Sequence, residues 1–476
     1  MSCFRPWILA AAGLLSAAAP TRHDPESLRA DLDHLYRGLE AAHFDLYAHR
    51  SRSQYDAEYR RVRAELTRPL TADQARVRFQ RFAAYGRVAH ATFADVSKAF
   101  LLFLERGGRS WSVDVRLDRG EVYVARAHAG LERGDRLVTL DGEPIGEVRA
   151  RLAAHVSADN DRLADSLLER AFPLFVWLEY GERSRFVLEV ERAGGVRKTH
   201  DVAAQTRAEA RTSSGSQSGF QLDPMERVAQ VLPGGIAYLR PGPFIELERG
   251  DAGMYDNRDF VKFVDGAFQR FLAERCHVLI VDLRNNPGGD HSFSDPMISW
   301  FADQPFAFAK RFEVRSSPQA AASNRARLEA NPSLRGGISG VLAQRYEETP
   351  PGETFEIALP PAAPRKGRRF TGSVYALIDR YSYSNAVNVA AVIQDYGFGT
   401  VVGEKTADLA TTFGAMESFR LPRTGLQVHF PKARIVRPSG ALEPDGVTPD
   451  LPIPSPRFPT RDVVLEKLLA RIRSRP

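Results

Sequence analysis

The sequence has few cysteines, and it lacks metal-ligand spacings, phosphate-binding glycine loops and clusters of basic residues. It has two cysteines, Cys3 and Cys276, and Cys3 lies in a segment that we expect to be removed, so an intrachain disulfide is excluded. No spacing of His, Cys, Asp or Glu is typical of a metal site, and no glycine loop is typical of phosphate binding. The net charge is only +6 and the arginines are spread along the chain. We therefore expect no metal, no cofactor and no nucleic-acid partner.

The chain also lacks an apolar stretch of the length that a membrane span requires. Its N-terminus carries a shorter run, Ile8–Leu15, which follows Arg5 and precedes the small residues Ala17–Ala19. A basic start, a short apolar run and an A-x-A-like site are typical of an export signal. We expect residues 1–19 to be removed, leaving a periplasmic or secreted protein with no stable membrane span. An uncleaved hydrophobic anchor is the alternative.

Composition is ordinary for a soluble protein, with 43% hydrophobic and 26% charged residues. Since a domain takes about 100–200 residues, the 476-residue length predicts about two to four domains. Residues 24–104 have leucines at helical spacing after Asp24 and Pro25, which is typical of a helix N-terminus. A Thr-x-x-Gln capping box predicts a further helix over residues 71–85.

Residues 107–205 show a different pattern, of short strands and turns. It predicts strands at Arg136–Leu140 and Phe186–Val190, with a helical stretch over residues 157–175 between them. The polar stretch 206–219 is typical of a linker. An α/β region is expected to follow it.

The run Val278–Asp290 combines a buried strand with a glycine turn. Its residues up to Leu283 are almost all apolar, as in a parallel strand covered on both faces. Pro287, Gly288 and Gly289 then end the strand, and glycines let the main chain approach a ligand closely. Such a turn can supply half of an oxyanion hole, although the same residues also serve as a plain turn.

A second unit of this kind follows within residues 372–406. Its pattern predicts a strand at Val374–Ile378, a helix at Asn385–Tyr396 and a strand that begins at Thr400. Ser384 stands at the N-terminus of the helix, where free amides and the helix dipole favour a developing negative charge. A serine in this place can also be a simple N-cap.

Together the two units resemble the family of C-terminal-processing (tail-specific) proteases and the tricorn core protease. DLRNNPGG, DRYSYSNA, QDYG, VVGEKT and GVTPD occur in family order, and the resemblance runs from about residue 30 to 455. Residues 129–148 resemble the PDZ segment of this family. The resemblance implies an α/β multidomain protein with a helical N-terminal region (24–104), a PDZ-like β-rich module (107–205) and a crotonase/ClpP-like α/β catalytic domain (220–476).

The resemblance also implies catalytic residues, with Ser384 as the nucleophile. The tail-specific branch has a lysine base about 25 residues later, but Leu409 stands there in this chain. The tricorn-like branch uses Ser, His and Glu instead. Its histidine is matched by His90 in GRVAHATF, and its glutamate by Glu443 before GVTPD. Imidazole suits a general base because its pKa lies near neutrality. Ala89 departs from this branch, which often has a small polar residue before the histidine.

The same resemblance suggests where an oxyanion would be held. The donors would be the backbone N–H of Gly288 or Gly289 and that of Asn385, the residue after the nucleophile. His291, directly after the glycine turn, is the best substitute for His90 as the base. Lys405 is expected on the surface at a strand end.

The first functional hypothesis is therefore a secreted or periplasmic serine endopeptidase. Its substrate would be a peptide or protein, held by its C-terminus on the PDZ-like module, which could also be purely structural. The second hypothesis is a protein on the same fold that binds a peptide or apolar ligand without catalysis, which Leu409 and Ala89 favour. A hydrolase of non-peptide esters or amides is the third. Cleavage specificity and oligomeric state stay open.

Overall fold

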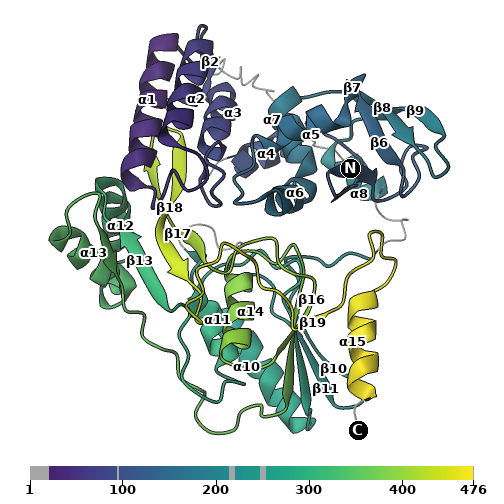
Figure 1. Cartoon of the computed structure of the whole chain (residues 1–476), viewed down its shortest axis with the longest axis vertical. Helices are drawn as coiled ribbons and strands as arrows, with labels where there is room; N and C mark the ends of the chain where they lie inside the picture. Colours follow the sequence, from purple (N-terminus) through teal and green to yellow (C-terminus); the bar gives the residue numbers. More distant parts are fainter. Residues whose placement is uncertain (1–20, 94–95, 214–219, 247–252, 475–476) are drawn as a thin grey trace, which may run out of the picture.

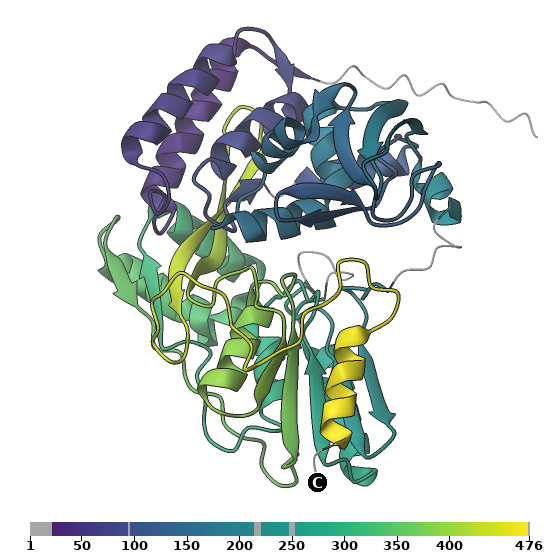
Figure 2. The same ribbon diagram turned by 45° about the vertical axis from the view of Figure 1, so that its right-hand side comes forward.

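The computed structural model describes residues 21–93, 96–213, 220–246 and 253–474, so the predicted export signal lies outside the described residues. Figure 1 shows N-terminal helices and a β-rich module above an α/β part that ends in the C-terminal helix. Figure 2 shows the same layers after a turn of the molecule. No helix within the described ranges is long and apolar enough to cross a bilayer.

The N-terminal region is helical, as predicted. Its helices are α1 (Pro25–Ala42), α2 (Arg52–Glu65), α3 (Ala72–Ala84) and α4 (Val96–Glu105). Short strands β1 (Arg22–His23) and β2 (Leu70–Thr71) pair beside them. The Asp24 carboxylate accepts the N–H of Ser27 at 2.9 Å and caps α1, while Thr71 and Gln74 form the predicted capping box of α3. The leucines at helical spacing in α1 are fully buried.

The β-rich module is one antiparallel sheet with helices packed beside it. Its strands follow the order β4 (Val115–Asp118), β5 (Glu121–Val124), β6 (Arg136–Leu140), β8 (Arg185–Glu191) and β9 (Arg197–Ala203), and β7 (Glu143–Pro144) pairs with β6. The predicted strands β6 and β8 are confirmed. The sheet ends in β4 on one side and β9 on the other.

The helical stretch predicted in this module is present and is divided in two. After α5 (Ile145–Ala153), the single helical stretch expected over residues 157–175 is two helices, α6 (Asp161–Arg170) and α7 (Phe172–Tyr180). They separate at Ala171, whose φ is −125°, and a proline occupies the first turn of α7. Proline fits there because the N–H groups of a first turn have no helical partner.

The stretch predicted as a linker also contains a helix. Residues Arg207–Ser213 form α8, and Thr206 and Glu209 exchange side chain-to-backbone hydrogen bonds at its start. This reciprocal pair is a capping box, which a reading based on polar composition overlooks.

The α/β part is built on a sheet in the order β10 (Val228–Leu232), β11 (Ile236–Arg240), β12 (Val278–Asp282), β15 (Ser373–Ile378), β16 (Thr400–Gly403) and β19 (Leu451–Pro452). Only β10 runs antiparallel to its neighbour. Strand β12 is buried along its whole length, which explains its almost continuous apolar sequence.

Both faces of this sheet are covered. Alternate residues such as Leu279 and Val281 pack with helices α10 (Arg258–Ala273), α11 (His291–Ile298) and α14 (Asn385–Asp395). The residues between them pack with the C-terminal helix α15 (Val463–Arg473). The two hydrophobic layers fix which strand ends meet at each edge of the sheet.

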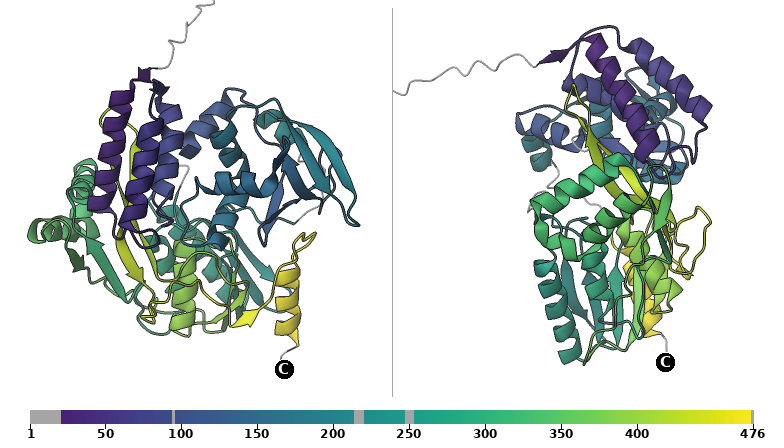
Figure 3. Two further views of the ribbon diagram at one scale, coloured as in Figure 1. Left: turned by 45° about the horizontal axis from the view of Figure 1, so that its top comes forward. Right: turned by 90° about the vertical axis from the view of Figure 1, so that its left-hand side faces the viewer.

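A second sheet connects the α/β part with the N-terminal helices. Its strands are β14 (Thr354–Glu356), β13 (Arg311–Arg315), β18 (Gln427–Val436), β17 (Thr412–Arg420) and the short β3 (Thr92–Phe93). Residues 427–436 form one long strand, β18. Between β13 and β14 the chain forms α12 (Pro318–Ala330), the 3-10 turn η3 (Pro332–Gly336) and α13 (Ile338–Glu348). Figure 3 shows β18 reaching up among the N-terminal helices.

Candidate active site

The glycine turn and the Ser384 turn meet because strands β12 and β15 are parallel neighbours. Their register pairs Asp282 with Leu377, so both strands end at the same edge of the sheet. The turns are then joined by hydrogen bonds from Tyr383 N–H to the Asn286 carbonyl (3.0 Å) and from Ser382 Oγ to the Leu283 carbonyl (2.8 Å). This direct contact brings the two sequence motifs together.

Ser384 lies in a conformation that L-amino acids rarely adopt. Its φ is 53° and its ψ is −123° at the N-cap position of α14, yet its side chain makes no capping hydrogen bond. The hydroxyl also has no hydrogen-bond partner elsewhere in the described ranges. A left-handed backbone costs about 1–3 kcal/mol and persists only where the surroundings hold it. The simple N-cap interpretation therefore does not account for this serine.

Gly288 packs directly against the turn of Ser384. A Cβ added to Gly288 would lie 2.5 Å from the carbonyl oxygen of Tyr383 and 2.8 Å from both the Asn385 nitrogen and the Ser384 Cβ. Its φ of 85° also favours glycine. Only a residue without a side chain leaves the space in front of the Asn385 amide open.

The three amides predicted for an oxyanion hole are not equivalent. Gly288 donates its N–H to the Asn286 Oδ1 at 2.8 Å, so this donor is engaged. The N–H groups of Gly289 and Asn385 have no hydrogen-bond partner within residues 21–93, 96–213, 220–246 and 253–474. Gly289 is held in place by a parallel bridge to Phe244, which receives an N–H bond from Asp290 at 2.9 Å. Two free amides thus remain, one within the glycine turn and one directly after Ser384 in the sequence.

His90 contacts the turn of Ser384 through a neighbouring ring. Its imidazole stacks on Tyr383, with ring centroids 5.2 Å apart and planes inclined by 27°. Its Nδ1 lies 3.0 Å from the carbonyl oxygen of Phe413. Because a carbonyl can only accept, Nδ1 carries the proton and Nε2 presents a lone pair. This is the tautomer that a general base requires.

The surroundings keep His90 uncharged near neutral pH. Burial lowers its pKa below the ordinary value, and the nearby Asp159 carboxylate and the Phe413 carbonyl only partly oppose this effect. Two short links hold the segment in place. Thr92 pairs with His429 in β18, and the N–H of Ala89 donates to Asp159 at 3.1 Å.

Glu443 is exposed, and no hydrogen bond or ion pair joins its carboxylate to another described residue. The Nδ1 of His90 is oriented by Phe413 instead. The structure thus shows no direct contact between His90 and Glu443, and a role for this glutamate stays a prediction.

The other residues weighed for the base have different neighbours. The His291 ring lies 5.1 Å from the ring of Phe308, and its Nδ1 is 3.9 Å from Asp290. Lys405 forms an ion pair with Asp445 at 2.5 Å and is partly exposed, as a strand-end lysine would be. Leu409 is buried.

Sequence reasoning missed two buried carboxylates at this site. Asp408 accepts the N–H of Ser384 at 2.6 Å, and Asp159 accepts the N–H of the residue before His90. The Asp159 side chain is 1% exposed and also lies 3.2 Å from His49 Nε2. Asp408 could have been noticed in the sequence because it stands next to Leu409, the position at which the tail-specific branch has its lysine. Asp159 lies in no motif.

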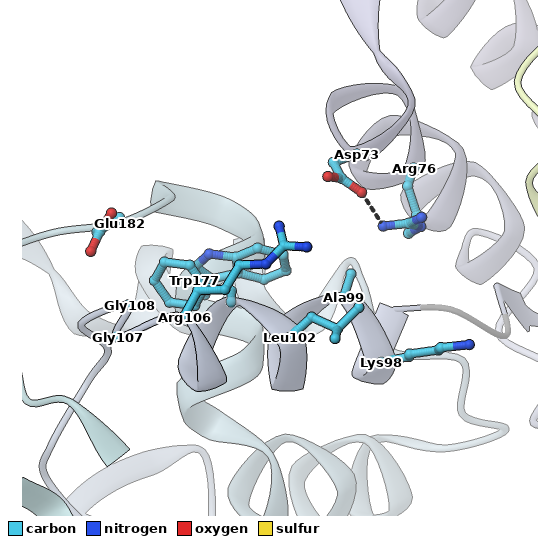
Figure 4. Close-up of a pocket in the computed structure, with 11 residues that line it drawn as sticks. Asp73, Arg76, Lys98, Ala99, Leu102, Arg106, Gly107, Gly108, Trp177 and Glu182 are labelled. Carbon is cyan, nitrogen blue, oxygen red and sulfur yellow. Dashed lines mark hydrogen bonds and ion pairs between the residues drawn. The ribbon is translucent and has the colours of Figure 1, made fainter. Parts of the chain in front are cut away.

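One cavity of the described structure lies away from these residues. It has a volume of about 690 Å³ and is lined by residues of α3, α4, α7 and the turn after α4, among them Arg76, Leu102, Arg106 and Trp177 (Figure 4). It contains none of the candidate residues. Within the described residues, no group of three or more His, Cys, Asp or Glu side chains could hold a metal ion.

The α/β part of the chain is similar to a known protein family. Residues 237–453 match the family model of peptidase family S41. No curated protein matches the sequence. The chain is similar to the crystal structure of mature CPAF, with 16% identity, a TM-score of 0.63 and coverage of 94% of this chain and 96% of that one.

A second structure, mature CPAF complexed with lactacystin, gives 16% identity and a TM-score of 0.62, and covers 94% of this chain and 98% of that one. At this identity the likeness shows the fold, which is shared along nearly the whole chain. The predicted mixed α/β multidomain fold is confirmed. The α/β part of the chain, residues 237–453, is thus similar in sequence to peptidase family S41.

Proposed function

We propose that the chain is a serine endopeptidase that acts outside the cytoplasm, in the periplasm or after secretion. Ser384 is the nucleophile, His90 is the general base, and the amides of Gly289 and Asn385 hold the oxyanion. The main support is the strained Ser384 turn, with a free hydroxyl beside free amides and next to the ring that stacks on His90. The short apolar run at the N-terminus supports the location.

The proposed reaction follows from these positions. The Ser384 Oγ attacks the carbonyl carbon of the scissile peptide bond while the Nε2 of His90 takes the hydroxyl proton. The charge that develops on the carbonyl oxygen is met by the N–H groups of Gly289 and Asn385, near the N-terminus of α14. When the C–N bond breaks, His90 gives its proton to the leaving amine. Water then releases the acyl group, with His90 again as the base.

Gly288 leaves space for the oxyanion rather than donating a hydrogen bond to it. Its amide is engaged by Asn286, but its missing side chain keeps the Asn385 N–H open. Glu443 would support the base through water or a neighbouring hydroxyl, because its carboxylate has no direct contact with the imidazole.

A peptide or protein is the proposed substrate, and the β-rich module would engage its C-terminus. The support is a sheet with two outer strands, β4 and β9, to one of which a peptide could add as a further strand. Cleavage rates of matched peptides with a free and an amidated C-terminus test this step. A preference for the free carboxylate is expected, and equal rates would leave the module with a structural role.

Substitution of the nucleophile tests the main proposal. Ser384→Ala should lower kcat on casein or a peptide by about 10⁶-fold, as removal of the serine from a hydrolytic triad does. A fluorophosphonate probe should label the natural chain at Ser384 and leave the variant unlabelled. Undiminished turnover in the variant would refute the assignment.

The alternative function is that of a peptide- or ligand-binding protein without catalysis. The observation that favours it is the exposed Glu443 without contact to His90, together with Leu409 where the tail-specific branch has its lysine. In that case the probe should leave Ser384 unlabelled in a folded chain that still binds peptides. An ester and amide panel would separate a non-peptide hydrolase.

A further inference from the structure

Asp408 is a fully buried carboxylate that touches the nucleophile through the backbone. Its Oδ2 accepts the N–H of Ser384 at 2.6 Å, and its Oδ1 accepts the N–H of Leu409 at 2.9 Å. It lies on the connection from β16 to β17, where Thr406 Oγ1 donates to the Asp408 carbonyl at 2.9 Å. Each carboxylate oxygen thus has one defined amide donor.

The contact with Ser384 matters because of the conformation that it holds. A residue at φ 53° returns to an ordinary conformation unless its peptide groups are pinned. A hydrogen bond to an ionised acceptor is about twice as strong as a neutral one. Rotation of the Ser384 peptide would move both the hydroxyl and the following N–H, that of Asn385.

The surroundings of Asp408 are poor in positive charge. Burial raises its pKa to about 7; the N–H of Ser384 lowers it, Asp159 raises it, and the N–H of Leu409 lowers it. The other titratable groups on this side are Tyr383 and His90. The Asp408 and Asp159 carboxylates both act to raise the pKa of Tyr383, and Asp159 acts to raise the pKa of His90. Arg170, which also acts on Tyr383, lies on α6 and donates to the Tyr381 carbonyl at 3.3 Å.

We propose that Asp408 is a positioning residue for the nucleophile: its ionised carboxylate holds the Ser384 N–H so that the hydroxyl and the Asn385 amide keep their places. This inference rests on the proposed function of Ser384. Asp408 does not touch the reacting atoms and acts through the backbone of the serine.

Ionisation of Asp408 makes the activity depend on pH. The carboxylate is the better acceptor, so the turn is held best when Asp408 has lost its proton, and kcat rises as pH rises through about 7. The pKa of His90 is lowered by burial, so its loss of a proton occurs at a lower pH. In the natural enzyme, the fall of kcat on the acid side of the pH profile (the acid limb) is therefore set by the protonation of Asp408. In Asp408→Asn the acid limb moves to the lower pH at which His90 takes up its proton.

The test measures kcat, KM and the rate of fluorophosphonate labelling from pH 5 to 9 for Asp408→Ala and Asp408→Asn. The alanine variant should lose about 10²-fold in kcat with little change in KM, since a misplacement of about 1 Å has a cost of that order. The asparagine variant, which keeps one acceptor, should lose less and should show the shifted acid limb.

Asp395→Asn is the matched control. Asp395 ends α14, the helix that begins after Ser384, and its carboxylate accepts from the Arg437 side chain at 2.6 Å and from the Ser439 N–H at 2.8 Å. This variant should keep the kcat and the acid limb of the natural chain.

Unchanged kcat and an unchanged acid limb in Asp408→Asn would overturn the inference while Ser384 remains labelled. An acid limb well below pH 7 in the natural enzyme would also overturn it, even if Asp408→Ala fails to fold. A natural chain that neither cleaves nor labels would instead overturn the proposed function.

Discussion

The two halves of the candidate site are built in different ways. The nucleophile half, which carries the proposed nucleophile, lies within the α/β part, where two parallel neighbouring strands bring the glycine turn to Ser384. The base half, which carries the proposed base, comes from the N-terminal region, and His90 is held by a two-residue strand pairing and by the carbonyl of Phe413, 323 residues away in the sequence. The first half follows from one sheet, whereas the second depends on packing between distant parts of the chain.

The β-rich module also touches the nucleophile half. Glu169 on α6 accepts hydrogen bonds from the side chains of Arg380 and Tyr381, each at 2.5 Å, and from the N–H of Leu117 at 2.8 Å. Arg380 donates in addition to the Leu117 carbonyl at 2.8 Å. The residues just before Ser384 are thus fixed from outside the sheet, so both halves of the site can be disturbed separately.

Among substitutions that disturb only one half of the site, removal of the proposed base is expected to cause the largest loss of kcat. His90→Ala should lower kcat by about 10²–10⁴-fold, the usual contribution of a general base, and leave the unfolding temperature nearly unchanged. Peptide turnover and thermal unfolding measure the two effects. His291→Ala is the control, because its ring packs on Phe308. A larger loss in His291→Ala than in His90→Ala would assign the base to His291.

A substitution in the glycine turn should break the nucleophile half. In Gly288→Ala the added Cβ meets the Tyr383 carbonyl and the Asn385 nitrogen, so we expect kcat to fall by about 10²–10³-fold, as for a lost oxyanion donor. Gly367→Ala is a matched control, since Gly367 has a φ of 84° against 85° for Gly288 but nothing within 4 Å of its added Cβ. Equal losses in both variants would show that strain rather than the blocked amide is responsible.

A smaller loss of activity is expected at the contact with the module. Glu169→Ala leaves the Arg380 side chain, which is 9% exposed, without its carboxylate partner, so the free energy of unfolding should fall by about 3–5 kcal/mol. Denaturant unfolding measures this, and kcat should fall less than in Gly288→Ala. Glu143→Ala removes a more exposed partner of Arg151 and should change stability little. A stable Glu169→Ala chain with normal kcat would show that the module does not steady the Ser384 turn.

Much of the fold could be predicted from local patterns. Strands β12 and β15 and helix α14 were confirmed because their burial on both faces leaves long apolar runs in the sequence. The helical stretch predicted over residues 157–175 is helical but consists of two helices, and the break at Ala171 could not be seen because helical spacing continues across it. The linker prediction overlooked α8, whose stability comes from a capping box rather than from an apolar face.

The site itself was only partly predictable. Gly288 and Ser384 lie in turns that follow recognisable strands, but Asp159 and Asp408 are single acidic residues without a local pattern. Asp159 meets its amide partner only when the segment before α6 packs against Ala89, and Asp408 meets its partner only when the connection after β16 packs against the Ser384 turn. The engagement of the Gly288 amide by Asn286 likewise depends on the folded turn.

The sequence by itself determined the two strand–turn–helix units, because apolar periodicity and glycine act over a few neighbouring residues. Only the tertiary structure decided which groups surround the serine hydroxyl: a carbonyl orients His90, a buried aspartate holds the Ser384 amide, and Glu443 stays in solvent. The physical reason is that hydrogen bonds and charge interactions depend on distance in space, which local sequence patterns do not encode.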